Sequence, residues 1–157
     1  MAKITRSQLG RRSRTKGSSF ERTIKNRLKQ VLGLSWPGVV IRRSVQADRA
    51  YEPDVVIEGV DVPELIRDLW LECNHSKEPN PGVKLAQALR DSSIARMATG
   101  RHRIPMVVWR RNKARTDNVT TTLAWLNYCT GMAYDDLHSE VEVTLPFEDL
   151  LKLLVGG

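Results

Sequence analysis

The chain has 157 residues, of which 41% are hydrophobic and 27% charged, and this length suits one compact domain with a single core. No apolar run approaches the ~20 residues that a membrane-spanning helix requires, and the start of the chain lacks the apolar segment of a secretory signal. We therefore expect no membrane association and a cytoplasmic location. Cys73 and Cys129 lie far apart and outside any C-x-x-C pair, so neither a disulfide framework nor a zinc site is predicted.

The charge is divided unevenly along the chain. Residues 1–115 hold 24 of the 25 Lys and Arg residues with 11 of the 18 acids, a net charge of +13. Residues 116–157 hold one Lys and seven acids, a net charge of −6. This imbalance predicts a polyanionic partner, and nucleic acid is favoured over a basic surface kept only for solubility.

The first 16 residues carry six basic side chains and no acid. A segment of this composition cannot bury apolar surface, so we expect residues 1–16 to form a flexible basic arm and residues 17–157 to form one domain. The residues of this arm that we expect to bind nucleic acid are Arg11, Arg12, Arg14 and Lys16.

A first helix is predicted over residues 17–33, because apolar side chains recur at helical spacing from Phe20 to Leu32. Ser18 is expected to cap its N-terminus and Gly33 to end it.

The other elements follow from short apolar runs between helix and strand breakers. Strands are predicted near residues 38–45, 53–59, 69–74 and 104–110, a helix over 83–100, and a strand leading into a short helix over 141–154, while 119–129 fits either strand or helix. The strand, helix and strand over residues 69–110 form a βαβ unit with parallel strands. In the helix of this unit, Leu85, Ala88 and Leu89 are expected to face inward and Gly100 to end it. The predicted fold class is therefore α/β.

Two carboxylates stand out in the predicted strands. Asp54 opens one apolar strand, and Glu72 lies near the end of another, on the same face as Asn74 and roughly 6.6 to 7 Å from it. If the two strands are neighbours, Asp54 and Glu72 meet at one edge of the sheet, where they repel each other unless a proton or a cation lies between them. Mg²⁺ would satisfy such a pair, with Mn²⁺ as a substitute. The alternative is that Asp54 caps a turn and that Glu72 lies exposed or pairs with an arginine.

These residues resemble a known family. Pro-Asp at residues 53–54 and Glu-Cys-Asn at residues 72–74 look like the motif of the PD-(D/E)XK nuclease superfamily. The segment RTKGSSFERTIKNRL, residues 14–28, is similar to the opening of the archaeal-type Holliday junction resolvases and their phage relatives, in which a Lys-Gly-Ser segment leads into a helix that carries a Glu. The resemblance covers about residues 14–110. It implies a restriction-endonuclease-like core with a mixed central sheet flanked by helices.

The resemblance also implies site residues, position by position. Glu21, Asp54 and Glu72 would hold the metal, with the main-chain carbonyl of Cys73 as a further ligand. Gln87, with Lys84 on the same helix face, would face the site or the DNA.

The start of the first predicted helix contains two further candidate residues, Ser18 and Ser19, and offers a second role for Glu21. Ser18 or Ser19 would contact a phosphate there, because the free amides of a helix N-terminus attract anions. Spacing alone gives Glu21 a different role, a capping box in which it bonds back to the amide of Ser18.

The sequence departs from the family at its third motif position, which is usually Lys and here is Asn74. In the expected chemistry an ammonium group stabilises the attacking hydroxide and the charge that accumulates on phosphorus. Three alternatives remain. Lys77 or Lys84 supplies the ammonium from another point of the chain, Asn74 orients the water while the metal does most of the electrostatic work, or the activity is lost and a DNA-binding shell remains.

The resemblance implies a Mg²⁺-dependent endonuclease that hydrolyses phosphodiester bonds in branched DNA such as four-way junctions, and that acts as a two-fold homodimer. Basic patches at residues 100–105 and 110–115 would grip phosphates and would not read bases, which favours selection of DNA structure over sequence. The alternatives are a nuclease of the same fold with another DNA substrate and a nucleic-acid-binding protein without catalysis.

Overall fold

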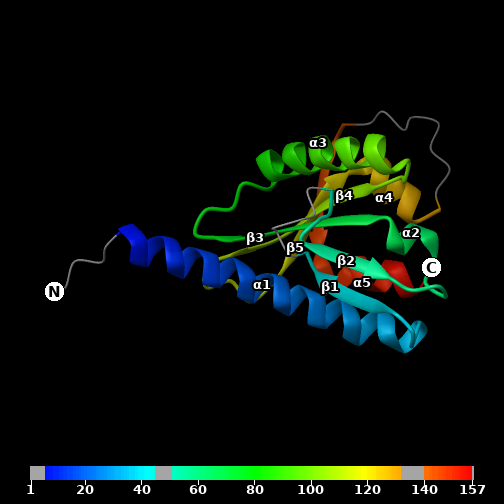
Figure 1. Cartoon of the computed structure of the whole chain (residues 1–157), viewed down its shortest axis with the longest axis horizontal. Coiled ribbons are helices and arrows are strands. Elements are labelled where there is room, and N and C mark those ends of the chain that lie inside the picture. The colour runs from blue at the N-terminus through cyan, green and yellow to red at the C-terminus, as the bar shows by residue number, and fades with distance from the viewer. Residues whose placement is uncertain (1–5, 45–50, 132–139, 157) are drawn as a thin grey trace.

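The computed structural model describes residues 6–44, 51–131 and 140–156 (Figure 1). Within these ranges the chain forms a six-stranded mixed sheet with helices on both faces, which confirms the predicted α/β class. The strands are β1 (Val40–Arg43), β2 (Val55–Glu58), β3 (Leu69–Ser76), β4 (Ile104–Arg111), β5 (Asn118–Thr122) and β6 (Glu142–Pro146). The helices are α1 (Arg6–Ser35), α2 (Glu64–Arg67), α3 (Pro81–Thr99), α4 (Leu123–Cys129) and α5 (Phe147–Gly156).

The strands lie in the sheet in the order in which they occur along the chain. Strands β3 and β4 are parallel and joined by α3, which confirms the predicted βαβ unit, and all other neighbouring strands are antiparallel. The central strand β4 is buried along most of its length, as expected for a strand covered on both faces. The buried middle of the sheet therefore fixes the positions of the side chains where β2 and β3 lie next to each other.

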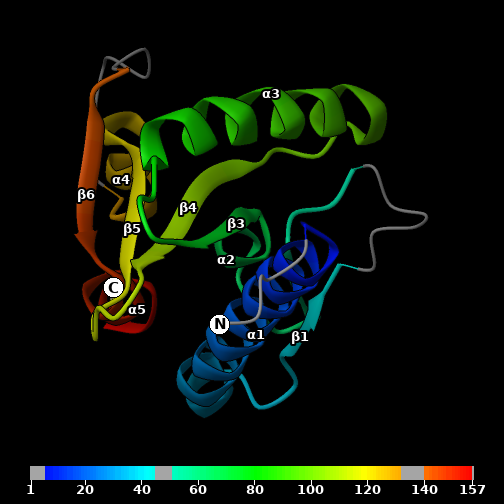
Figure 2. The same ribbon diagram turned by 90° about the vertical axis from the view of Figure 1, so that its left-hand side faces the viewer.

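Helices α1 and α5 pack on one face of the sheet and α3 packs on the other (Figure 2). The larger core lies under α1 and α5, where Phe20, Ile24, Leu28 and Leu32 form the buried stripe of α1. The smaller core lies under α3 and contains Trp70, Ala88 and Ala95. Alternation along β3 therefore sends Leu71 toward α1 and Trp70 toward α3.

Helix α1 begins at Arg6, so the prediction that it starts at Ser18 is wrong. Residues 6–16, expected to form a flexible arm, are helical; the stretch has no proline, and its Arg, Lys, Gln and Leu residues favour a helix although Gly10 does not. The first buried side chain of α1 among those described is Phe20, and the turns before it extend beyond the ends of the strands (Figure 1). Lys16 anchors these turns by a hydrogen bond to the side chain of Asn112, which follows β4.

Helix α3 has the expected C-terminal stop and a clear N-terminal cap. The Asn80 side chain accepts a hydrogen bond from the amide of Val83 at 3.2 Å. Gly100 has φ of 70°, and its amide donates to the carbonyl of Arg96 at 2.7 Å. Leu85 and Ala88 are buried as predicted, whereas Leu89 is exposed because it points away from the sheet.

The C-terminal part resolves the choice between strand and helix over residues 119–129, since β5 and α4 divide this stretch at Thr122. The Thr122 side chain accepts a hydrogen bond from the amide of Trp125 and caps α4. As predicted, β6 runs into α5 at Pro146.

The turn between β2 and α2 requires a glycine. Gly59 has φ of +143°, and a Cβ there would lie 2.8 Å from the Val62 side chain and 3.2 Å from the carbonyl of Gly38. This close approach brings the β1–β2 hairpin against α2.

Among the described residues, no helix combines the length and the apolar character needed to cross a membrane.

Candidate functional site

Asp54 and Glu72 lie side by side on neighbouring antiparallel strands, as predicted. The pairing of Val55 with Leu71 puts Asp54, the residue before β2, next to Glu72 in β3. Asp54 accepts a hydrogen bond from the amide of Cys73 at 2.8 Å. The alternative in which Asp54 caps a turn and Glu72 pairs with an arginine is therefore not what the fold produces.

Glu72 lies on the α3 side of the sheet, two residues from Trp70, whose indole N–H donates to the Glu72 carboxylate at 2.8 Å. Burial raises the pKa of Glu72 to about 8, and the charge of Asp54 adds to the rise, while the indole hydrogen bond opposes it. Burial and the charge of Asp54 thus both disfavour the charged form of the Glu72 carboxyl.

Glu21 approaches the same place from α1. Burial and the charge of Asp54 raise the pKa of Glu21, while an ion pair with Arg43 lowers it. Both Nε and Nη2 of Arg43 bind the Glu21 carboxylate, at 2.9 and 2.8 Å. The predicted capping box is absent, because Ser18 lies inside α1 and Glu21 turns toward the sheet.

We call Glu21, Asp54 and Glu72 the carboxylate cluster. Burial raises the pKa of the Cys73 thiol, and the charges of Asp54, Glu21, Glu72 and Asp117 raise it further. The charge of Asp54 acts on Glu21 of α1 and on Glu72 of β3, so Asp54 is the acid that the other two have in common.

The cluster has the donor type of a hard divalent cation, because carboxylate and carbonyl oxygens are the ligands that Mg²⁺ prefers. In the described part of the chain, no three His, Cys, Asp or Glu side chains are arranged so that together they could hold a metal ion. Each carboxylate has an oxygen held by a nitrogen donor of the protein: Arg43 on Glu21, the Cys73 amide on Asp54 and the Trp70 indole on Glu72. The main-chain carbonyl of Cys73 remains a predicted ligand.

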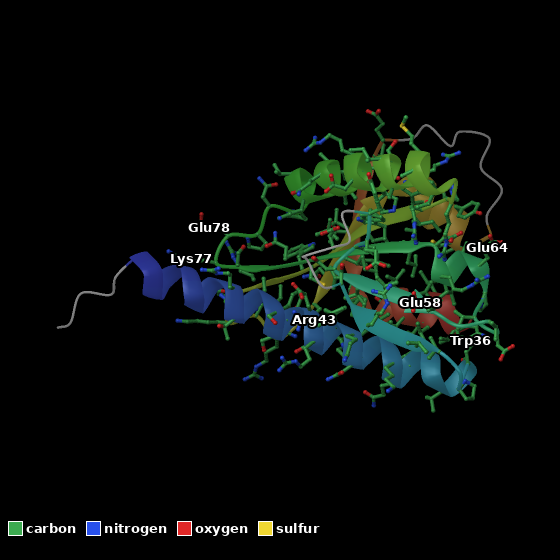
Figure 3. All side chains as sticks on the ribbon, viewed as in Figure 1. Trp36, Arg43, Glu58, Glu64, Lys77 and Glu78 are labelled. Atoms are coloured by element: carbon green, nitrogen blue, oxygen red, sulfur yellow. The ribbon has the colours of Figure 1, made fainter. Side chains whose placement is uncertain are left out.

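The lysines proposed to replace the missing motif lysine differ in position. Lys77 is exposed in the loop after β3, and Figure 3 shows it beside Glu78, near the N-terminal turns of α1. It lies five positions beyond Glu72 in the chain, about 16 Å along an extended strand. Lys84 is half-buried near the start of α3.

The face of α3 that covers the sheet is defined by buried Ala88 and by Asp91, whose charge contributes to the raised pKa of Glu72. Lys84 lies four residues before Ala88 and shares this face. Gln87 is exposed one turn after Lys84 on α3, and its contact with the site or the DNA stays a prediction. Asn74 is half-buried in β3, on the same side as Glu72.

The residues expected to bind nucleic acid in the first 19 positions lie on α1. Ser18 and Ser19 occupy the middle of this helix, so the predicted phosphate site at its N-terminus is wrong for them. Arg14 is exposed and Lys16 is half-buried beside Asn112. The side chains of Arg11 and Arg12 lie outside the described part of the structure.

The two predicted basic patches lie at opposite ends of β4, and several of their arginines have structural partners. Arg101 donates to Asp68 at 2.8 Å and to the carbonyl of Arg67, and Arg103 is half-buried with its guanidinium over the ring of Trp70. The patch at residues 100–105 is thus largely part of the fold.

In the second patch, Arg110 donates to buried Asp117 at 2.5 and 2.9 Å. Arg111, Lys113 and Arg115 are exposed around the β4–β5 turn. Among the described side chains, the cations that lie exposed or half-buried at this end of the sheet, which we call the basic end, are Arg14, Lys16, Lys77, Arg111, Lys113 and Arg115.

Sequence reasoning missed two residues of the site, Arg43 and Trp70. Trp70 could have been found from alternation, because residues 70 and 72 of one strand share a face. Arg43 could not, since its place beside Asp54 depends on the register of β1 against β2, and the hairpin connecting them gave no two-residue turn signal.

No model of a known protein family matches the chain, and no curated protein sequence matches it.

Proposed function

We propose that the protein is a divalent-metal-dependent endonuclease that hydrolyses phosphodiester bonds in branched DNA. The observation that carries the proposal is the carboxylate cluster: the pKa values of Glu21 in α1 and Glu72 in β3 are both raised by burial and by the charge of Asp54. Carboxylates gathered against their own repulsion in a chain of net charge +7 are typical of a site that binds a cation next to a polyanion.

Mg²⁺ or Mn²⁺ would be held by Asp54 and Glu72, with Glu21 and the carbonyl of Cys73 as the further donors that the resemblance implies. When bound, the ion would supply positive charge that lowers the pKa of water and offsets the charge of the scissile phosphate. The chain's own part is to fix the donors, through the Cys73 amide on Asp54 and the Trp70 indole on Glu72.

In the reaction, the oxygen of a water molecule adds to phosphorus and the bond from phosphorus to the 3′ oxygen breaks. The products are a 5′-phosphate and a 3′-hydroxyl, and the proton released by the water ends on the 3′ oxygen through solvent. Asn74, next to Glu72 on the same face of β3, would orient the water by its amide.

The basic end supports DNA as the substrate. Its cations lie on α1, on the loop after β3 and on the β4–β5 turn, so they can follow a phosphate backbone without reading base edges. Contacts of this kind favour recognition of DNA shape, which is the property required for branched substrates.

The test is incubation of the purified protein with a labelled four-way junction, a linear duplex and a single strand, with Mg²⁺ at one salt concentration. We expect cleavage of the junction in preference to the other two substrates. Asp54→Asn keeps an oxygen for the Cys73 amide, and it should lower the rate at least about 100-fold, because one metal ligand loses its charge.

The matched control is Asp61→Asn, which removes an exposed acid between β2 and α2 and should cleave like the wild type. Equal cleavage of linear duplex and junction would favour a nuclease of the same fold with another DNA substrate. An uncleaved junction with both Mg²⁺ and Mn²⁺ would overturn the proposal.

A second candidate function is DNA binding without catalysis, and the observation that favours it is Asn74 at the position of the family's lysine. In this case binding should depend steeply on salt, and divalent metal should bring no cleavage. Asn74→Lys separates the candidates, since a gain of cleavage in this variant alone would indicate that only the ammonium is missing.

The resemblance implies that two copies act together, so that both strands of a junction are cut. We therefore propose a homodimer on the substrate. Light scattering of the protein with and without a junction should give the mass of two chains per junction.

A further inference from the structure

Arg43 is the last residue of β1 and lies next to the carboxylate cluster. It pairs with Val55 across the β1–β2 ladder, and the amide of the following residue, Ser44, donates to the carbonyl of Asp54 at 3.1 Å. The main chain of Arg43 is thus fixed beside that of Asp54. Figure 3 shows Arg43 near the middle of α1, well apart from Lys77.

The guanidinium of Arg43 holds one oxygen of Glu21 through two nitrogens, Nε and Nη2. Its side chain is 30% exposed and that of Glu21 is 20% exposed, so the pair lies at the surface of the cluster. Within the described ranges Glu21 is the only residue that this guanidinium bonds, and two of its five N–H groups suffice for these bonds. A guanidinium has the planar, two-pronged geometry that matches phosphate oxygens.

Arg43 contacts the cluster through Glu21, unlike Lys77 and Lys84, the two residues proposed above for the role of the missing lysine. Lys77 is exposed at the basic end, and Lys84 lies on the sheet-facing side of α3 without a bond to any cluster carboxylate in the described part of the chain. Asn74 offers no charge.

We propose that Arg43 is the catalytic cation that contacts the scissile phosphate, in the role that the resembled family gives to the lysine replaced here by Asn74. The inference rests on the proposed function. A divalent cation held by Asp54 and Glu72 would supply positive charge beside Glu21, and the N–H groups of Arg43 would then be available to a phosphate oxygen. The ion pair between Glu21 and Arg43 is then the resting arrangement of both groups.

The first experiment measures single-turnover cleavage of a four-way junction with Mg²⁺ by Arg43→Gln, Arg43→Lys, Lys84→Gln and Arg42→Gln. Arg42 is the matched control, because it is the neighbouring residue of β1, is 28% exposed, and is likewise paired, with Glu52 and Glu58, away from the cluster. We expect Arg43→Gln to be at least about 100-fold slower than Arg42→Gln, as for the loss of a donor to transition-state charge. Arg43→Lys, which keeps the charge, should recover most of this loss.

The second experiment needs no cleavage. Junction binding is measured with Ca²⁺ in place of Mg²⁺ over a range of salt concentrations. Arg43→Gln should lower the slope of log Kd against log salt by about 1, because one phosphate contact is lost, while Arg43→Lys and Arg42→Gln should keep the slope of the wild type. Thermal unfolding of each variant shows whether a change comes from loss of the fold.

Two results would overturn the inference: cleavage by Arg43→Gln within about two-fold of Arg42→Gln, or a loss of cleavage in Lys84→Gln that is absent in Arg43→Gln. A wild-type protein that cuts no DNA removes the proposed function, and this is seen before any variant is made. The slope of log Kd against log salt then tests separately whether Arg43 contacts a phosphate, and an unchanged slope in Arg43→Gln would refute this contact.

Discussion

Each acid of the carboxylate cluster is held by a different nitrogen donor, and each donor comes from a different kind of group. A guanidinium holds Glu21, a main-chain amide holds Asp54, and an indole holds Glu72. These bonds offset part of the cost of bringing three carboxylates together in a partly buried place. They do not remove it, since the pKa values of both Glu21 and Glu72 remain raised.

The raised pKa of Glu72 predicts how the stability of the metal-free protein depends on pH. The folded value of about 8 lies above the ordinary value of 4.5, so the folded state binds the proton more tightly than the unfolded state. The contribution of Glu72 to the free energy of unfolding is therefore present at low pH and is lost as the pH rises from about 4.5 through about 8. Glu72→Gln lacks this loss and keeps an oxygen for the Trp70 indole.

We expect the free energy of unfolding of Glu72→Gln to exceed that of the wild type by about 2–4 kcal/mol at pH 9 in the presence of EDTA, and to equal it near pH 4. Urea unfolding at a series of pH values measures the difference. A gap between the two proteins that stays constant across the pH range would contradict the account of Glu72.

At the residue scale, the sequence predicted the acids and missed their partners. Asp54 and Glu72 could be found because each interrupts an apolar strand, and alternation put Glu72 and Asn74 on one face. The role of Glu21 came from the resemblance alone, since its spacing from Ser18 favoured a cap. The place of its partner Arg43 depends on the register of β1 against β2, because a shift of one residue would turn the Arg43 side chain to the other face of the sheet.

At the scale of elements, α1 connects the basic end to the carboxylate cluster. Its N-terminal turns extend past the sheet, Phe20 begins its buried stripe, and Glu21 faces the cluster one position later. A duplex that lies along the N-terminal half of α1 would therefore be led to the cluster by the same helix that supplies one of its acids.

The basic end predicts the salt dependence of DNA binding. Lys77→Gln, Lys113→Gln and Arg115→Gln combined should lower the slope of log Kd against log salt by about 2 to 3, since each phosphate contact contributes about 0.9 to this slope. The matched control replaces three exposed cations elsewhere, Lys29, Arg96 and Lys152, with Gln. Fluorescence anisotropy with a labelled junction measures both, and equal slopes for the two triple variants would show that the basic end has no special part.

A buried ion pair fastens α1 to the β4–β5 turn. Asp117 is 5% exposed and accepts bonds from Arg27 of α1 and Arg110 of β4. Removal of the acid leaves the half-buried guanidinium of Arg110 without this counter-charge and leaves Arg27 paired only with exposed Glu148, which is more costly than the loss of one exposed pair.

We expect Asp117→Asn to lower the free energy of unfolding by about 3 kcal/mol. Asp149→Asn is the control, because the pair of Asp149 with Lys152 is exposed and should contribute little. Chemical denaturation at neutral pH measures both changes. Similar values for the two variants would show that the buried pair does not hold α1 in place.

The helices and strands could be predicted where the sequence shows a clear hydrophobic period or a Gly or Pro that ends an element. They could not be predicted where contacts between distant residues determine the structure. The strands, α3 with its Gly100 cap and the change from β6 to α5 at Pro146 all follow from local pattern. The start of α1 does not, because its first turns contain no apolar stripe and a contact of Lys16 with distant Asn112 anchors them. Helix α2 has four residues, too few to show a periodicity in the sequence.

At the scale of the whole molecule, the basic and the acidic parts of the sequence form different parts of the fold. The strongly basic residues 1–115 build α1 and strands β1 to β4, whereas the acidic residues 116–157 build β5, α4, β6 and α5 at the other end of the strand order. The acids gathered at the β2–β3 edge are thus an exception within a basic half. The proposed divalent cation would account for that exception, because it would turn a negative cluster into a place where a phosphate can bind.

The most direct test of this account is an anomalous difference map from a crystal soaked in Mn²⁺. The account predicts a strong peak between the carboxylates of Asp54 and Glu72, within about 2.5 Å of an oxygen of each. Asp54→Asn crystals should lose the peak. A map of the wild type without a peak at this position, at Mn²⁺ concentrations that saturate other sites, would contradict the central claim that these acids bind a metal ion.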